Sequence, residues 1–308
     1  MEKEQELFEV IIIGAGPAGL SAAVYAVRAR LKSLLLEKEY MSGGQIVTTT
    51  EVDNYLGLPG MNGFDMAMKF RDHAVAMGVE FAEGTVLSLE RQGQNWCVRT
   101  EDKEYLTRTV IVATGASHRM LGIPGEERLR GNGVSYCATC DGAFFRDRTV
   151  AVVGGGDVAV GDAVFLSRLC RKVYLIHRRD SLRAAKALAD KVIGLDNVEV
   201  LWNTTPLSIE GEEQVCALRI RNTAEDTETE LPVDGVFVAV GMEPNVKGVP
   251  EQILDGKQGY IEAGEDGKTS LPGLYAAGDV RTKQVRQIAT AVSDGANVIA
   301  AVERYLNE

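Results

Sequence analysis

The chain has 308 residues, of which 45% are hydrophobic, and its 44 acidic and 33 basic side chains give a net charge of −11. This length accommodates two ordinary domains with separate cores. The negative charge argues against a nucleic-acid surface, and no apolar stretch approaches the roughly 18 residues of a membrane helix. The charged start MEKEQELFEV shows no export signal, so we expect a cytoplasmic protein.

The first predicted element is a buried parallel strand at residues 10–13, followed by a glycine turn and an alanine-rich helix. Gly14, Gly16 and Gly19 form G-x-G-x-x-G, which lets the backbone turn tightly and approach a pyrophosphate at the helix N-terminus. The next strand, SLLLE, ends at Glu37, where a carboxylate suits an unphosphorylated adenosine ribose. This unit favours FAD or NAD.

The next buried strand, VIVATG, ends at Ala113, Thr114 and Gly115, and the loop GIPGEERLRGNG follows it. A buried strand followed by a glycine or proline breaker is typical of a chain that passes between domains. We therefore predict a domain crossing near residue 117.

The five cysteines are too few and too scattered for a secreted disulfide framework. Cys137 and Cys140 form a Cys-x-x-Cys pair, which is either redox-active or half of a zinc site. Zinc needs two more ligands, and the sequence has no second close Cys or His pair, so we expect redox chemistry and no metal. Cys97, Cys170 and Cys216 fall in apolar patterns and are expected in the core.

The strand, turn and helix of the first unit recur in TVAVVGGGDVAVGDAVFLSRL. Gly154, Gly156 and Ala159 give the G-x-G-x-x-A form of the motif. A single copy also serves close packing of a helix on a strand, whereas two copies in the same context favour two nucleotide sites.

The end of the second strand differs between the two units. Where the first has Glu37, the second has His177, Arg178 and Arg179, with Arg183 one turn further on. Guanidinium groups bind a 2′-phosphate through charge-assisted hydrogen bonds, and a carboxylate would repel it. The second unit is therefore expected to bind NADP(H), although the arginines are also compatible with a solvated strand end.

The last part of the chain is predicted to complete the first sheet. The strand GVFVAVG leads to a second crossing near residue 245, and one strand, a loop and a long amphipathic helix beginning near Gln284 follow. This segment is too short to fold alone. We therefore predict one domain from residues 1–117 and 246–308, with a second domain, residues 118–245, inserted in it.

A series of motifs along nearly the whole chain resembles those of the low-molecular-weight thioredoxin reductases of bacteria. The element Cys-Ala-Thr-Cys-Asp inside the second unit is the most specific, because the larger disulfide reductases carry their cysteine pair in the first domain. The resemblance implies an α/β fold with two Rossmann-like nucleotide-binding domains, the NADPH domain inserted into the FAD domain. The motifs are GAGPAG at 14–19, GGQ at 43–45, ATG at 113–115, CATCD at 137–141, HRR at 177–179, GDV at 278–280 and RQ at 286–287.

The resemblance implies a homodimeric enzyme that moves electrons from NADPH through FAD and the cysteine pair to thioredoxin. It places Cys140 toward FAD, gives Cys137 the mixed disulfide with the partner, and makes Asp141 the acid-base residue. It also implies that the inserted domain rotates, so that nicotinamide and disulfide alternate at the flavin. The implied cofactor contacts are Gly14, Gly16, Pro17, Ala18, Gly19, Glu37, Gly44, Gln45, Asn54, Val86, Ala113, Thr114, Gly115, Gly154, Gly156, Asp157, His177, Arg178, Arg179, Arg183, Gly278, Asp279, Arg286, Gln287 and Ala289.

Three other functions stay open at this point. A reductase of the same fold could serve a glutaredoxin-like or peroxiredoxin-linked protein. A ferredoxin-linked enzyme is disfavoured by Arg178, Arg179 and Arg183. A flavin-binding scaffold without turnover is disfavoured by the cysteine pair with Asp141 beside it.

Overall fold

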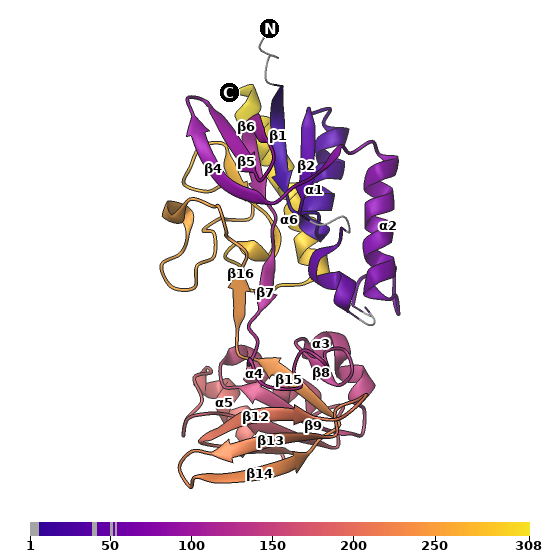
Figure 1. Cartoon of the computed structure of the whole chain (residues 1–308), viewed down its shortest axis with the longest axis vertical. Helices are drawn as coiled ribbons and strands as arrows, with labels where there is room; N and C mark the ends of the chain where they lie inside the picture. The colour runs from indigo at the N-terminus through magenta and orange to yellow at the C-terminus, as the bar shows by residue number, and fades with distance from the viewer. Residues whose placement is uncertain (1–5, 39–41, 50–51, 53) are drawn as a thin grey trace. The chain divides into compact units, whose positions relative to one another are not determined.

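A computed structural model describes residues 6–38, 42–49, 52 and 54–308, and the chain divides into two compact units (Figure 1). The first unit contains residues up to 49, 55–117 and 243–308, and the second contains residues 118–242 together with the short segment that includes Asn54. The two connecting segments, β7 (Ala116–His118) and β16 (Met242–Pro244), pair as a two-stranded sheet.

The first unit is built on a sheet whose parallel strands run in the order β3-β2-β1-β6, with β17 beside β6. The late strand β17 completes this sheet, as the sequence predicted for the C-terminal segment. An antiparallel hairpin, β4-β5, extends the sheet from β6. The bounds are β1 Leu7–Ile13, β2 Ser33–Glu37, β3 Phe81–Glu83, β4 Val86–Gln92, β5 Asn95–Thr100, β6 Glu104–Val112 and β17 Leu274–Ala276.

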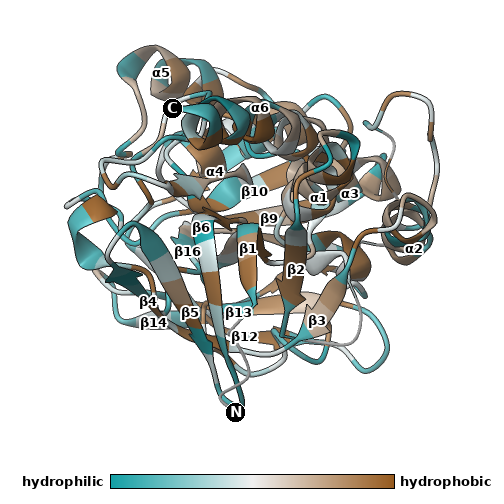
Figure 2. Ribbon diagram, turned by 90° about the horizontal axis from the view of Figure 1, so that it is seen from above, coloured by the Kyte–Doolittle hydropathy of each residue, from teal (hydrophilic) through white to brown (hydrophobic). Residues whose placement is uncertain are grey.

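Alternate residues of β1 bury opposite faces of this sheet, as the two-residue period of a strand requires. Val10 and Ile12 pack with helices α1 (Pro17–Arg28) and α6 (Ile288–Asn307), whereas Ile11 and Ile13 pack toward the β4-β5 hairpin. Strand β2 is apolar along most of its length in Figure 2 because both of its faces are covered. The remaining elements are α2 Gly63–Ala76 and the short 3₁₀ turns η1 Gly44–Thr48, η3 Glu251–Ile253 and η4 Gly278–Val280.

The second unit repeats this layered plan. Its parallel sheet has the order β11-β10-β9-β15-β8. Val150 and Val152 pack with helices α4 and α5, and the alternate residues Ala151 and Val153 pack against an antiparallel sheet of β12, β13 and β14. The bounds are β8 Val134–Ser135, α3 Ala138–Asp141, η2 Gly142–Phe145, β9 Thr149–Gly154, α4 Asp157–Leu166, β10 Lys172–Ile176, α5 Lys186–Ile193, β11 Val198–Leu201, β12 Thr204–Glu210, β13 Ala217–Asn222, β14 Thr227–Pro232 and β15 Gly235–Ala239.

The structure corrects two expectations. Helix α6 begins at Ile288, not near Gln284, because the Thr290 hydroxyl accepts the Gln287 N–H at 3.2 Å and so marks the first turn. Cys97 and Cys170 are buried as predicted, but Cys216 is exposed. Its neighbours Val215 and Ala217 face the core, so the alternation of an extended chain turns Cys216 outward.

None of the described helices combines the length and the apolar character needed to cross a membrane. Within the described residues there is also no group of three or more His, Cys, Asp or Glu side chains that could hold a metal ion.

Candidate active site

The three glycines of the first turn have different roles. A β-carbon at Gly14 would lie 2.6 Å from the carbonyl oxygen of Ala113, and one at Gly19 would lie 1.8 Å from the carbonyl oxygen of Gly14. These two glycines allow strand and helix to pack closely. At Gly16, by contrast, a β-carbon would meet nothing within 4 Å. Gly16 therefore faces open space, where a ligand can approach the backbone.

Helix α1 starts at this open face without a side-chain cap. Its N-cap is Gly16, and Pro17 follows at the start of the helix. Helix α2, by contrast, begins with Asn62, whose side chain accepts the Phe64 N–H at 2.9 Å. Uncapped N–H groups and the helix dipole together attract an anion such as a pyrophosphate.

The carboxylate of Glu37 belongs to the same turn. Its Oε2 accepts the N–H of Ala15 at 2.6 Å, and its Oε1 accepts the N–H of Lys38 at 2.7 Å. Glu37 at the end of β2 is thereby fixed beside the glycine turn, with acceptor capacity left for a ribose hydroxyl.

Asp279 lies in the η4 turn, and its Oδ1 is buried without a hydrogen-bond partner among the described residues. Burial raises the pKa of Asp279, and the charges of Lys283 and Arg286 oppose that rise. A buried carboxylate oxygen without a partner is uncommon in folded proteins. A polyhydroxyl ligand such as the ribityl chain of FAD would supply the missing donor.

The other predicted contacts of the first unit occupy varied positions. Gly44 and Gln45 are exposed on η1, which is tied to the glycine turn by the Gly43 N–H on the Ala15 oxygen at 2.8 Å. Arg286 stacks on Tyr260, with its guanidinium carbon 4.1 Å from the ring centroid, and Gln287 is the N-cap of α6. Ala289 and Asn54 are exposed.

Two features of the first unit were not anticipated by the sequence analysis. Val86, a predicted cofactor contact, is partly buried and packs against the apolar core beneath the β4-β5 hairpin. The backbone of Asn245 holds the segment Thr114–Gly115. Its carbonyl oxygen accepts from the Thr114 hydroxyl at 2.5 Å, and its N–H donates to the Gly115 carbonyl oxygen at 3.0 Å. In the sequence, the only feature that pointed to Asn245 was its position at the second predicted domain crossing.

The second glycine turn repeats the division of roles. A β-carbon at Gly154 would lie 2.4 Å from the carbonyl oxygen of Ala239, whereas one at Gly156 would meet nothing within 4 Å. Gly156 is the N-cap of α4, which again has no side-chain cap. The first residue of the helix, Asp157, accepts the Ala185 N–H at 2.7 Å and so holds the loop after β10 beside the turn.

His177 and the arginines separate in this loop. Arg178, Arg179 and Arg183 are exposed. The backbone N–H of Arg183 donates to the carbonyl oxygen of Gly155 at 2.7 Å. His177 is only 4% exposed, and its Nε2 lies 3.0 Å from the Ser181 oxygen. Burial lowers the pKa of His177 and so favours the neutral ring. A β-carbon at Gly155 would lie 2.1 Å from Nδ1 of His177, so the ring packs against the glycine turn, whereas the three arginines are exposed.

Cys137 and Cys140 form a disulfide around the start of α3, with their Cα atoms 5.3 Å apart. Both residues are half-buried, so the bond is neither sealed in the core nor fully in solvent. The second sulfur lies within the helical turn and the first lies at its N-cap. A thiolate at a helix start is stabilised relative to a free cysteine.

Asp141 follows the disulfide directly and is held by one hydroxyl. Its Oδ2 accepts from Ser135 Oγ at 2.6 Å, and its Oδ1 is buried without a partner among the described residues. Burial raises the pKa of Asp141, an effect that the Ser135 hydrogen bond partly offsets. Ser135 Oγ also accepts the Cys137 N–H at 3.1 Å. This serine was missed because no sequence pattern marks a strand hydroxyl two residues before a cysteine.

This arrangement suits thiol-disulfide exchange coupled to proton transfer. The disulfide can be opened by two electrons, and a carboxyl group with a raised pKa can protonate the thiolate that leaves. Ser135 joins the two groups by bonding both the Cys137 backbone and the Asp141 carboxyl.

Comparisons with known proteins agree with this chemistry. Residues 8–295 match the family of pyridine nucleotide-disulphide oxidoreductases. The thioredoxin reductase of Listeria innocua is 43% identical over 100% of this chain and 97% of its own length, and that of Bacillus subtilis is 41% identical over 99% and 96%. The crystal structure of thioredoxin reductase from Streptococcus pyogenes superposes with a TM-score of 0.91 at 42% identity, covering 99% of both chains. The chain therefore belongs to the pyridine nucleotide-disulphide oxidoreductase family.

Proposed function

We propose that this protein is an NADPH-dependent, FAD-containing thioredoxin reductase. The observation that carries the proposal is the Cys137–Cys140 disulfide with the buried Asp141 carboxyl next to it, in the same unit as the exposed arginines of the second glycine turn. Relatives at 41–43% identity over nearly the whole chain are named thioredoxin reductase, which supports this substrate.

The two cofactors are assigned to the two turns. The first turn suits FAD, because Gly16 leaves an open face at the uncapped start of α1 and Asp279 has a buried oxygen without a partner among the described residues. The second turn suits NADPH, because Arg178, Arg179 and Arg183 can pair with a 2′-phosphate. When bound, FAD accepts a hydride and passes an electron pair to a disulfide, chemistry that no side chain supplies.

The protein's own residues manage sulfur and protons. We assign to Cys137 the attack on the thioredoxin disulfide and to Cys140 the position nearer the flavin. Asp141 delivers a proton to the thiolate that leaves when a disulfide opens, and Ser135 holds that carboxyl in place. One turnover consumes NADPH, a proton and oxidised thioredoxin, and yields NADP⁺ and dithiol thioredoxin.

Three further features belong to this proposal. The second unit turns on its two connecting strands, so that NADPH and the disulfide act alternately. The enzyme is a homodimer. It works in the cytoplasm, where a reduced thiol pool is maintained.

Steady-state NADPH oxidation with and without oxidised thioredoxin tests the function. Rapid oxidation only when thioredoxin is present supports it. Rapid NADPH oxidation with a glutaredoxin-like or peroxiredoxin-linked protein, and none with thioredoxin, would show that the substrate is one of those proteins and not thioredoxin. Turnover with reduced ferredoxin but not with NADPH would exclude the proposed electron donor.

A further inference from the structure

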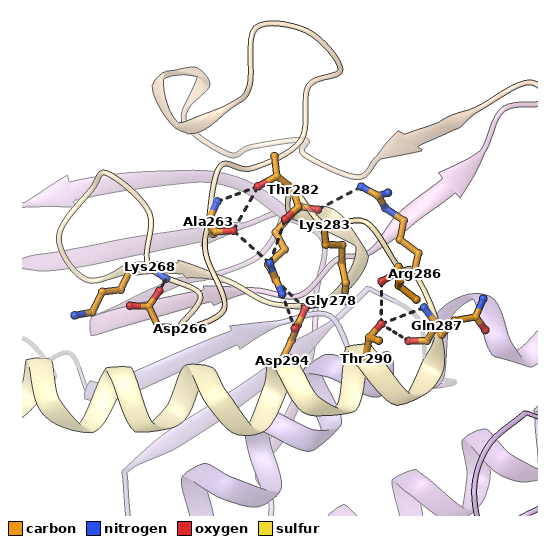
Figure 3. A network of polar contacts seen from close by, with 12 residues as sticks. Ala263, Asp266, Lys268, Gly278, Thr282, Lys283, Arg286, Gln287, Thr290 and Asp294 are labelled. Carbon is orange, nitrogen blue, oxygen red and sulfur yellow. Dashed lines mark hydrogen bonds and ion pairs between the residues drawn. The ribbon is translucent and has the colours of Figure 1, made fainter. Parts of the chain in front are cut away.

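A buried carboxylate on helix α6 holds the turn that carries Asp279 (Figure 3). Asp294 is 6% exposed, and its Oδ2 accepts the N–H of Gly278 at 2.8 Å. Its two oxygens also accept from Nε and Nη2 of Arg281, at 2.8 and 2.7 Å. A further donor, Nζ of Lys283, lies 3.0 Å from Oδ2. The η4 turn is thus attached to one side chain.

The same part of α6 packs against the first glycine turn. A β-carbon at Gly295 would lie 2.3 Å from the carbonyl oxygen of Ala18, and one at Gly278 would lie 2.8 Å from the Ala18 side chain. Ala18 lies in the first turn of α1, where the open face begins. Asp294 therefore fixes the position of Asp279 relative to that open face.

The charges in this cluster do not balance. The side chains of Arg281, Lys283 and Asp294 are only 9%, 7% and 8% exposed, so two cations lie against one carboxylate away from water. Such an excess of buried positive charge favours a further anionic partner nearby. Burial and Asp294 raise the pKa of Asp279, whereas Lys283, Arg286 and Arg281 lower it, with Lys283 the largest of the three. Lys283 is therefore the cation that most favours the ionised form of Asp279.

We propose that Asp294 is a positioning residue of the FAD site: it holds the Gly278–Asp279 turn through the Gly278 N–H and keeps Arg281 and Lys283 beside that turn. An ionised carboxylate accepts hydrogen bonds from ligand hydroxyls with both oxygens, whereas a protonated one loses part of that capacity. The inference rests on the proposed function, because it takes FAD as the ligand of the first unit.

The positioning role is tested by measuring FAD binding to the full-length protein from which flavin has been removed. Quenching of flavin fluorescence is the signal. Asp294→Asn keeps the shape and one acceptor but removes the charge. We expect its FAD dissociation constant to rise about tenfold or more. Asp266→Asn is the matched control, because Asp266 is a turn carboxylate of the same unit whose Oδ1 accepts the Lys268 N–H at 3.1 Å. It should bind FAD like the wild type.

Lys283→Met tests the charge. Without this cation the pKa of Asp279 rises further, so the carboxylate becomes protonated at higher pH. As the pH is lowered, FAD binding by Lys283→Met should therefore weaken at a higher pH than FAD binding by the wild type. In an Asp279→Asn background, Lys283→Met should no longer alter the pH dependence.

Circular dichroism and the thermal midpoint of each variant separate folding from binding. A folded Asp294→Asn protein with wild-type FAD affinity would overturn the positioning role, even if its thermal midpoint were lower. If Asp294→Asn does not fold, the Lys283 series decides: a wild-type pH dependence in Lys283→Met would overturn the inference. Failure of the wild type itself to bind FAD would instead refute the proposed function.

Discussion

The first and second glycine turns have the same backbone arrangement and differ in a few side chains. In both, the first glycine packs against a neighbouring strand end, the second faces open space, and the helix starts without a side-chain cap. At the end of the next strand, Glu37 accepts the Ala15 N–H in the first unit, whereas exposed arginines surround a buried His177 in the second. We propose that the strand and turn form a dinucleotide site in each unit and that the charge at this one position selects the dinucleotide.

The largest expected effect comes from the feature that only the second unit has, its disulfide. Cys137→Ser and Cys140→Ser should each lower thioredoxin reduction to about a thousandth or less, because exchange needs both sulfurs. Anaerobic spectra should show a long-wavelength charge-transfer band only in Cys137→Ser, where Cys140 is left as a thiolate. Cys216→Ser, an exposed thiol of the same unit, is the control and should be unchanged. A band seen only in Cys140→Ser would reverse the two roles.

The basic end of the second turn gives the next effect. Replacing Arg178 and Arg179 together with Gln removes several charge-assisted hydrogen bonds, each contributing about 1.5–3 kcal/mol. The KM for NADPH should rise by about a hundredfold or more, while that for NADH changes little. Arg168→Gln, an exposed arginine beyond the end of α4, is the matched control. Equal changes for both coenzymes would show that the arginines do not read the 2′-phosphate.

Ser135 offers a sharper test of the acid beside the disulfide. In Ser135→Ala the pKa of Asp141 rises, because the Ser135 hydrogen bond lowers it. An acid that must be protonated loses activity as the pH rises through its pKa, so the alkaline limb of thioredoxin-dependent turnover should move to higher pH. The free energy of unfolding, from urea denaturation, should fall by about 1–3 kcal/mol. Ser135→Thr keeps the hydroxyl and should restore the wild-type pH profile. An alkaline limb that does not move in Ser135→Ala would show that Asp141 does not deliver the proton.

The acidic end of the first turn should give the smallest effect. Glu37→Gln keeps an acceptor for the Ala15 N–H but loses the charge, so FAD should bind about three- to tenfold more weakly. Glu83→Gln is the matched control, since Glu83 is exposed and lies beside Glu37 in the register of β2 and β3. Equal losses in both variants, measured by fluorescence titration, would point to net charge and not to a specific contact.

The repeated units could be read from the sequence because strand, glycine turn and helix leave local patterns. The strands ending at Ile13 and Glu37 and the cysteine pair have such patterns. The return of the last strand to the first sheet followed instead from the shortness of the C-terminal segment. The direction in which a residue of a turn faces leaves no such local pattern. The sequence therefore did not distinguish Gly16 from Gly14, or the inward ring of His177 from the exposed arginines.

Residues that act through three-dimensional contacts were missed for the same reason. Ser135 lies on a short strand, and Asp294 lies on a helix seven residues after the N-cap Gln287, where an aspartate suggests only a polar face. Their partners, Asp141 and the η4 turn, are brought to them by folding. The exposed side of Cys216 follows from strand alternation, which the apolar composition of its surroundings obscured.

The most direct test of the account is an anaerobic absorption titration of the purified protein, first with NADPH and then with oxidised thioredoxin. We predict a flavin spectrum that needs about two equivalents of NADPH for full reduction, because FAD and the Cys137–Cys140 disulfide each take an electron pair, and that returns to the oxidised form when thioredoxin is added. A flavin that NADPH does not bleach, or a bleached flavin that thioredoxin does not reoxidise, would contradict the central claim that the two units together pass electrons from NADPH to thioredoxin.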